Sequence, residues 1–155
     1  MMKEKNYRIL FLGRILVGLV FAYSGYTKLM DPIENFQAAI AAYEIIPYGL
    51  VPFIAHVIPW MEIIFGAMML AGYMTRVSAL VLTGMSLSFV FLILITKIMT
   101  GALPSDCGCF GEGSLVHLKP LEVFVLDIIN TIIGIKLFLT QAHPFSLDSF
   151  LIQES

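Results

Sequence analysis

Four long apolar runs constrain this chain more than any other feature of its sequence. They cover residues 9–30, 52–72, 77–99 and 121–140. Each run has about the 20 residues that an α-helix needs to cross the hydrocarbon core of a bilayer. Charged residues make up only 13% of the chain, well below the roughly 25% of soluble domains. The sequence therefore predicts an all-α integral membrane protein, a four-helix bundle in which residues 1–155 form a single domain.

The segment between the first two runs, residues 31–52, predicts a short additional helix. Its apolar side chains recur at helical spacing: Ile33, Phe36, Ile40 and Tyr43. We expect this helix to lie at the membrane surface, although it lacks the basic face of a free lipid-binding helix. The second and third runs are joined by the short turn GYMTR, which favours antiparallel neighbours.

The distribution of Lys and Arg predicts the orientation of the helices. With the N-terminus inside, five bases lie on or near the cytoplasmic side: Lys3, Lys5, Arg8, Arg76 and Lys136. Three lie near the outer side: Lys28, Lys97 and Lys119. We therefore expect a multi-pass protein of the inner (cytoplasmic) membrane, with both termini cytoplasmic and the loop 100–120 periplasmic. The first run exceeds the core of a secretory signal, which favours an uncleaved helix over cleavage near Ala22 or Ser24.

The composition also excludes several classes of ligand. The net charge is −2 and there is no basic cluster, so no nucleic-acid partner is expected. The sequence contains no phosphate-cradling loop and no sign of a haem or flavin site. We predict no tightly bound cofactor.

The stretch SDCGCFG, residues 105–111, holds both cysteines of the chain, Cys107 and Cys109. On the periplasmic side they meet an oxidising compartment, in which disulfides persist. A ring closed across one glycine departs from preferred disulfide geometry and should be easily reduced. It also restrains the unfolded chain little, so a redox role is favoured over a structural one. Asp106 is expected to accept a proton or to oppose thiolate formation through its like charge.

Three other interpretations of the two thiols stay open. The cysteines can be an inert reduced pair, or a disulfide that only pins the loop. They can also be half of a metal site completed by Asp106 and His117, although a closed zinc site needs four ligands and this loop offers few.

Charged residues inside the runs form a second group of candidate site residues. Arg14 shares a helical face with Gly18, Gly25 and Lys28, where small residues allow another helix to approach closely. Glu62 lies near the middle of the second run, where an ionised carboxylate is costly without a partner. We expect Arg14 to be that partner, with Lys28 second, and Lys28 alone to reach toward the headgroups.

Two interpretations of these charges compete. One is an ion pair that only clamps two helices together. The other is a polar cavity that binds the head group of a quinone or relays protons, with Arg14, Glu62 and Lys28 as the binding residues.

The fourth run carries a further polar stripe: Asp127, Asn130, Thr131 and Gly134. Glu122 lies at the outer end of this stripe, close to the cysteine loop. Hydrogen bonding between helices explains the stripe as well as a functional role does.

These motifs together resemble a known family. The pattern GRILVGLVFAYSGYTKLMDP, then YEIIP, PWMEIIFGAMMLAGYMTR and DCGCFG, is similar to the DoxX-like membrane proteins and more closely to their MauE (methylamine utilisation) branch. The resemblance covers about residues 8–139. It implies a four-helix membrane bundle, and it associates the chain with maturation of methylamine dehydrogenase, whose small subunit is periplasmic and rich in disulfides. Relatives are linked with thioredoxin-like proteins and, in the wider group, with a thiosulfate:quinone oxidoreductase.

The leading functional hypothesis is a membrane thiol–disulfide redox protein. Cys107 and Cys109 would exchange disulfides with a periplasmic thioredoxin-like partner or an exported cysteine-rich protein. Electrons would pass to or from a membrane quinone near Arg14 and Glu62, while Lys97, Lys119 or His117 stabilise the attacking thiolate. The alternatives are a non-catalytic membrane subunit or assembly factor, and a carrier for a small molecule or metal.

Overall fold

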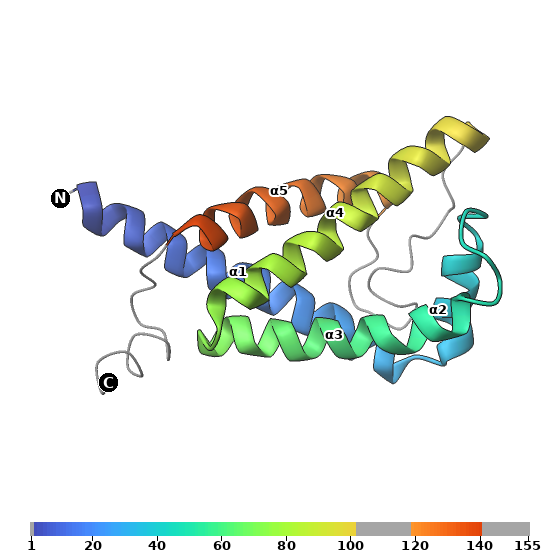
Figure 1. The fold of residues 1–155 in the computed structure, drawn as a ribbon, viewed down its shortest axis with the longest axis horizontal. Helices are drawn as coiled ribbons and strands as arrows, with labels where there is room; N and C mark the ends of the chain where they lie inside the picture. Colours follow the sequence, from blue (N-terminus) through green and yellow to red (C-terminus); the bar gives the residue numbers. More distant parts are fainter. Residues whose placement is uncertain (1, 102–118, 141–155) are drawn as a thin grey trace.

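The computed structural model describes residues 2–101 and 119–140. Within these ranges the chain forms five α-helices and no strand (Figure 1). The helices are α1 (Met2–Met30), α2 (Ile33–Ala41), α3 (Val51–Ala71), α4 (Thr75–Thr100) and α5 (Pro120–Leu139). The all-α prediction is confirmed, and each apolar run coincides with one long helix. Only α1 differs much, because it extends through a charged N-terminal segment whose Lys and Glu residues favour helix.

The long helices associate as two antiparallel pairs. α1 packs mainly on α3, and α4 packs mainly on α5. The start of α1 and the end of α5 lie at one end of the molecule, called here the terminal end, whereas α2 lies at the other, called the α2 end (Figure 1). Residues 102–118 join the ends of α4 and α5 that point toward the α2 end.

Glycines set how closely α1 and α3 approach. A Cβ atom added at Gly25 would lie 2.6 Å from the Pro59 carbonyl oxygen, and one added at Gly66 would lie 2.7 Å from the Ala22 amide nitrogen. Both contacts are with backbone, which cannot move aside cheaply. The expected close approach at the small residues of α1 is therefore confirmed. The same contacts fix the register, because they place Gly25 beside Glu62.

The α4–α5 interface is polar as well as close. Ser78, Thr83 and Ser86 are buried on α4, and Asn130 and Thr131 are buried on α5. At Gly134 an added Cβ would collide with the Thr83 hydroxyl. The predicted stripe on the fourth run therefore faces a second polar stripe on its neighbour.

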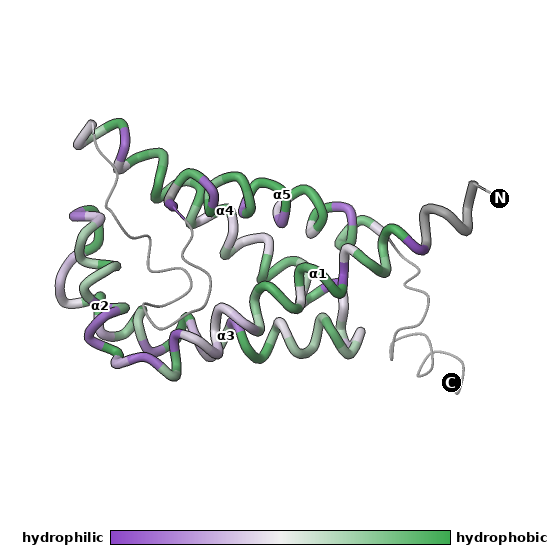
Figure 2. The backbone as a smooth tube through the Cα atoms, turned by 180° about the vertical axis from the view of Figure 1, so that it is seen from behind, coloured by the Kyte–Doolittle hydropathy of each residue, from purple (hydrophilic) through white to green (hydrophobic). Residues whose placement is uncertain are grey.

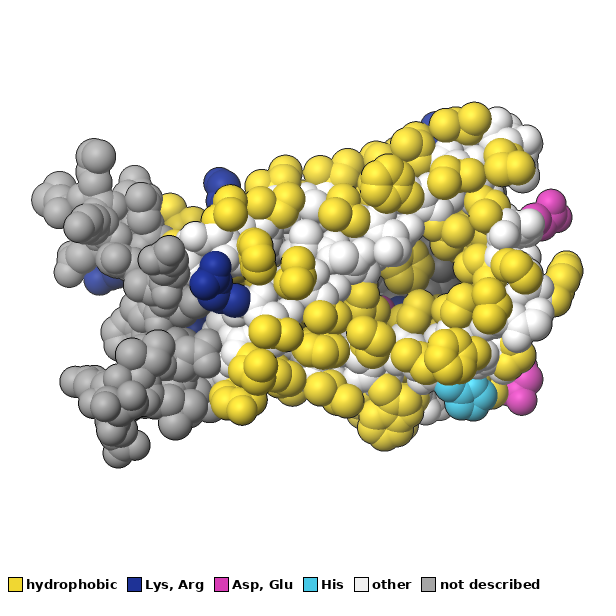
Figure 3. Space-filling model, viewed as in Figure 1, with side chains coloured by type: hydrophobic (Ala, Val, Ile, Leu, Met, Phe, Trp, Pro, Cys, Tyr) yellow, Lys and Arg dark blue, Asp and Glu magenta, His cyan; other side chains and the backbone are white. Residues whose placement is uncertain are grey.

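α3 and α4 are antiparallel, as their short connection predicts, but the distance between them grows away from the turn that joins them. The turn uses left-handed backbone at Gly72 and Met74, with φ of 70° and 45°. From this turn α4 leans away from α3 toward the α2 end (Figure 1). The space-filling view shows a hollow between the two helices, with charged side chains visible at its floor (Figure 3).

The short helix α2 packs against the beginning of α3. Phe36 and Ile40 are buried with Val51 and Ala55 in a small apolar cluster. Tyr43 is also buried. The short helix predicted from the spacing of these side chains is therefore confirmed.

The outer surface of the long helices is apolar. Hydrophobic residues cover most of their length in Figure 2, and hydrophobic side chains cover the face in Figure 3. Within the described residues, three helical segments are long and apolar enough to cross a membrane: Arg8–Met30, Val51–Ala71 and Thr75–Thr100. α5 has similar length but carries Glu122, Asp127 and Lys136. Three candidate spans are thus present, and a fourth crossing by α5 stays a prediction.

Candidate functional site: a buried charged pocket

The central feature of the site is an ion pair between α1 and α3. Lys28 lies in the last turn of α1, and Glu62 lies in the middle of α3. The side chain of Lys28 is fully buried and that of Glu62 is 2% exposed. The close approach at Gly25 brings the two helices together at this level.

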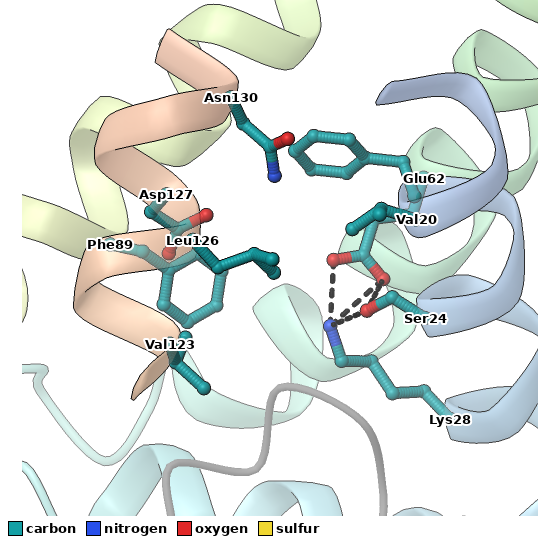
Figure 4. A pocket seen from close by; sticks show the side chains of 10 residues that line it. Val20, Ser24, Lys28, Glu62, Phe89, Val123, Leu126, Asp127 and Asn130 are labelled. Atoms are coloured by element: carbon teal, nitrogen blue, oxygen red, sulfur yellow. Dashed lines mark hydrogen bonds and ion pairs between the residues drawn. The ribbon is translucent and has the colours of Figure 1, made fainter. Parts of the chain in front are cut away.

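The contacts of this pair are short and numerous. The Lys28 ammonium donates to Glu62 Oε1 at 2.6 Å and to Oε2 at 2.8 Å. It also donates to the Ser24 hydroxyl at 3.1 Å, and that hydroxyl donates to Glu62 Oε2 at 3.3 Å. Figure 4 shows the three side chains joined in this network. A buried ion pair is tolerated only when geometry and extra hydrogen bonds offset desolvation, and here both are present.

Aromatic rings enclose the ammonium group on its other sides. Lys28 Nζ lies 5.0 Å from the centroid of the Phe36 ring and 5.7 Å from that of Phe89. Both distances fall within the range of cation–π attraction. Phe36 belongs to α2 and Phe89 to α4, so four elements converge on one charge: α1, α2, α3 and α4. The expectation that Lys28 reaches outward to the headgroups is therefore wrong.

A small cavity adjoins the pair. It is lined by Val20, Phe21, Ser24, Lys28, Glu62, Phe89, Val123, Leu126, Asp127 and Asn130. About 20 Å³ of it is open to the centre of a water molecule, which is room for about one water. Asp127 and Asn130 line the wall formed by α5, opposite the pair (Figure 4). The pocket thus contains two acidic side chains and one basic side chain.

Asn130 differs from the other polar residues of the pocket. It is 2% exposed, and neither its amide nitrogen nor its amide oxygen has a hydrogen-bond partner in the described part of the chain. A buried amide without partners costs free energy. Its position on the cavity wall therefore marks a place for a water molecule or a polar ligand atom.

Arg14 is not part of this pocket. Gly25 marks the level of Glu62, and Arg14 precedes it by 11 residues, or about 16 Å along the helix. Arg14 is buried toward the terminal end, where its guanidinium lies 5.2 Å from the Phe11 ring centroid. The prediction of Arg14 as the first partner of Glu62 is wrong, and the second candidate, Lys28, forms the ion pair.

The other predicted site residues lie outside the described residues. They are Asp106, Cys107, Cys109 and His117, all within 102–118. The redox, structural and metal interpretations of the cysteines therefore remain predictions. In the described ranges no group of three or more His, Cys, Asp or Glu side chains could hold a metal ion.

Several pocket residues were not predicted from the sequence as members of a common site. Asp127 and Asn130 were noted only as part of a stripe, whose helical spacing was the available signal. Ser24 and Phe89 gave no signal, because a serine or phenylalanine in a spanning helix is unremarkable. Only the packing of the helices shows that these four residues meet at Lys28 and Glu62.

These features define a multi-pass membrane protein with a charged pocket buried among its helices. The comparison with protein families identifies it further: the model described as "Methylamine utilisation protein MauE" matches residues 6–142. The chain belongs to the MauE family. The predicted relation to the wider DoxX group is not tested by this match.

One curated relative was also found. Protein TlpB of Flavobacterium psychrophilum is 25% identical over 160 residues, which cover 98% of this chain and 42% of TlpB. The chain thus spans about two fifths of the length of the curated relative it matches. No solved structure matches this chain.

Proposed function

We propose that this protein is a membrane thiol–disulfide redox protein of the inner membrane, in which Cys107 and Cys109 exchange disulfides with a periplasmic partner. The carrying observation is the buried Lys28–Glu62 pocket, which lies beside the helix that follows the cysteine segment. Lys119 ends that segment, and Val123, four residues later, lines the pocket. This is about 6 Å along the helix. For electrons to pass to an acceptor in the pocket, the proposal requires the cysteines to come close to this wall.

The reaction balances in two steps. In the oxidising direction, a thiolate of the partner attacks the Cys107–Cys109 disulfide, and a mixed disulfide forms. The second partner thiol resolves it, leaving an oxidised partner and a reduced Cys107–Cys109 dithiol. The dithiol then gives two electrons and two protons to a quinone, so that a disulfide and a quinol form. The same steps in reverse balance equally, with a quinol as the reductant.

The pocket supplies groups suited to a quinone head group. A quinone presents carbonyl oxygens on opposite sides of its ring, and the Asn130 amide on the α5 wall is a donor without a partner among the described residues. Lys28 on the facing wall already donates its three protons to Glu62 and Ser24, so a quinone carbonyl would bind there by displacing one of these acceptors. The cavity now has room for about one water, so a ring would have to enter by displacing apolar side chains. The hollow between α3 and α4 is the natural entry, because it opens on the apolar face of the molecule (Figure 3).

Membership of the MauE family supports a role beside other proteins in the maturation of exported proteins. More than half of TlpB lies outside its match to this chain. A membrane domain of this kind can therefore occur within a longer protein, as expected if it acts next to a partner. The partner we propose is a periplasmic thioredoxin-like protein or an exported cysteine-rich protein.

Trapping the thiols in intact cells tests the proposal. A reagent that adds mass to free thiols reports the redox state directly, because Cys107 and Cys109 are the only cysteines of the chain. We expect the pair to change between disulfide and dithiol when respiration is blocked. The Cys107→Ser and Cys109→Ser variants should each trap a mixed disulfide or lose partner oxidation. Thiols that stay reduced in all conditions would contradict the proposal.

A second candidate is a non-catalytic membrane subunit or assembly factor. It is favoured by the completeness of the Lys28–Glu62 network, since a helix clamp needs no ligand. Replacing both cysteines with serine separates the two functions. Loss of partner oxidation with assembly intact supports the redox role, whereas unchanged function would leave the assembly role.

A further inference from the structure

In the part of the chain that the structure describes, five buried polar side chains of α4 and α5 lack hydrogen-bond partners. They are Ser78, Thr83, Ser86, Asn130 and Thr131. The hydroxyl oxygens of the first three and of Thr131, and both amide atoms of Asn130, are buried and have no hydrogen-bond partner among the described residues. None of the five is more than 8% exposed. Other hydroxyls of α4 behave differently, since Ser88 and Thr96 each donate to the carbonyl four residues earlier, at 2.8 Å. On α4 the unpartnered hydroxyls of this group therefore lie on the buried stretch from Ser78 to Ser86.

These side chains follow one another along the molecule. The contact of Thr83 with Gly134 sets the antiparallel register of α4 and α5, which places Ser86 near the level of Thr131. Asn130 lies on the pocket wall, one residue from Thr131. Ser78 precedes Ser86 by eight residues, about 12 Å along α4 toward the terminal end. Along the helix axis the five side chains thus extend from the pocket to the first turn of α4.

The terminal end of the series is close to exposed polar groups. Arg76, two residues before Ser78, donates from Nε to the Phe138 carbonyl oxygen at 3.3 Å in an exposed contact. The other end meets Glu62. Lys28 and Ser24 of α1 contact the Glu62 carboxylate. Asp127 lines the α5 wall of the same pocket. Glu62 and Asp127 are therefore the two acidic side chains of the pocket that can take up a proton.

A buried hydroxyl or amide without a partner costs about 1–3 kcal/mol. Five such groups inside a small protein would together cost several times as much. Ordered water removes this cost, because a buried water makes about three hydrogen bonds to otherwise unsatisfied polar groups. Hydroxyls and water linked in series also form a route along which protons can move.

We propose that Ser78, Thr83, Ser86, Asn130 and Thr131 hold a water chain that carries protons between the Lys28–Glu62 pocket and the terminal end of the molecule. The polar groups supply hydrogen bonds, and Glu62 is the group that exchanges the proton. The inference rests on the proposed function only for its purpose, which is to move the two protons that accompany quinone reduction or quinol oxidation. The path itself operates without a redox partner.

Labelling with dicyclohexylcarbodiimide tests the path. This reagent enters from the lipid and modifies carboxyl groups in their protonated form, and mass spectrometry distinguishes Glu62 from Asp127. Right-side-out and inverted membrane vesicles containing the full chain, with the internal pH buffered, allow the pH of either side to be changed alone. We expect labelling of Glu62 to follow the pH on the side of the terminal end. If labelling of Glu62 in the unmodified protein follows only the pH on the opposite side, the proposal is overturned.

Two nearly isosteric variants block the path. Asn130→Leu and Thr131→Val remove polar groups while keeping the number of side-chain heavy atoms and the branching, and each should abolish the response of Glu62 labelling to that side. Thr100→Val is the matched control, because the Thr100 hydroxyl donates to the carbonyl of Thr96 on its own helix, away from the path. An undiminished response in both folded path variants would also overturn the proposal. Inert cysteines would refute the redox function while leaving this result unaffected, so the two failures are distinguishable.

Discussion

Glu62 shows how a single residue determines the local structure around it. A carboxylate at this depth requires compensation, and the chain provides an ammonium group, a hydroxyl and two aromatic rings around that ammonium. Each of these groups comes from a position that only the folded chain brings near. The network therefore explains why α1, α2, α3 and α4 all meet at this level.

The ion pair predicts a strong asymmetry between single and double variants. Lys28→Met should destabilise the protein by about 3–5 kcal/mol, because it leaves the Glu62 carboxylate buried without its partner. The double variant Lys28→Met/Glu62→Met should cost much less, since apolar side chains replace both charges. Reversible denaturant unfolding in detergent measures both. Lys97→Met is the control, because Lys97 is exposed near the end of α4, and equal losses in the single and double variants would argue against the pair.

The same pair of variants separates a clamp from a functional site. If the pair only holds the helices together, the double variant should restore redox cycling of the cysteines along with stability. If the pocket takes part in electron transfer, we expect stability to recover while cycling stays lost. Thiol trapping in cells, with respiration active and blocked, distinguishes these results.

The sequence allowed part of this site to be predicted. A single Glu in an apolar run requires a partner for its charge, so Glu62 and Lys28 were both identified as candidate site residues. The choice between Arg14 and Lys28 depended on the register of α1 and α3. That register comes from backbone contacts at Gly25 and Gly66, which no periodicity in either helix reveals.

At the scale of elements, the glycine contacts make a graded prediction. Gly25→Ala would place a methyl group 2.6 Å from a backbone oxygen of α3, and should destabilise by about 1–3 kcal/mol, as overpacked sites do. Gly134→Ala meets a side chain, the Thr83 hydroxyl, rather than backbone. Room for the methyl group requires a change in χ1 of this β-branched residue, so we expect a cost no larger than that of Gly25→Ala. Thermal unfolding in detergent ranks the variants.

Gly84 provides the matched control for this series. It lies within α4, and an added Cβ has nothing within 4 Å. Gly84→Ala should therefore be neutral or should stabilise by up to about 1 kcal/mol, through the higher helix propensity of alanine. A Gly25→Ala variant as stable as Gly84→Ala would show that α1 and α3 are packed less closely than the structure indicates.

The elements themselves were largely predictable. Long apolar runs and the helical spacing of Ile33, Phe36 and Ile40 give reliable signals, because burial in lipid or in a core requires that spacing. The pairing of the helices was harder to predict. A short turn implies that α3 and α4 are neighbours, yet each packs mainly on another helix, because small residues and polar groups decide which surfaces meet.

At the scale of the whole molecule, the number of crossings decides where the chain ends lie. The start of α1 and the end of α5 are both at the terminal end (Figure 1). If α5 crosses the membrane with the three candidate spans, both ends face one compartment. If it does not, they face opposite compartments.

α5 carries three charged residues, which oppose its insertion into the hydrocarbon core unless they lie at its ends or face the other helices. Glu122 and Lys136 lie in its first and last turns, where headgroups and water can reach them. Asp127 is the only one of the three at depth, and it is 7% exposed, on the wall of the pocket rather than on the lipid side. A charge that faces the interior of the bundle is compatible with a spanning helix. We therefore expect α5 to cross.

Reporter fusions measure the outcome. A fluorescent protein that folds only in the cytoplasm should be bright when fused after residue 140 and when fused before α1. Alkaline phosphatase, which is active only in the periplasm, should be active when inserted between residues 101 and 119 and inactive after residue 140. The turn at Gly72 serves as an internal reference, because it should report the same compartment as the two ends. Phosphatase activity after residue 140 would mean that α5 does not cross, and the pocket would then have one wall formed by a helix that does not span the bilayer.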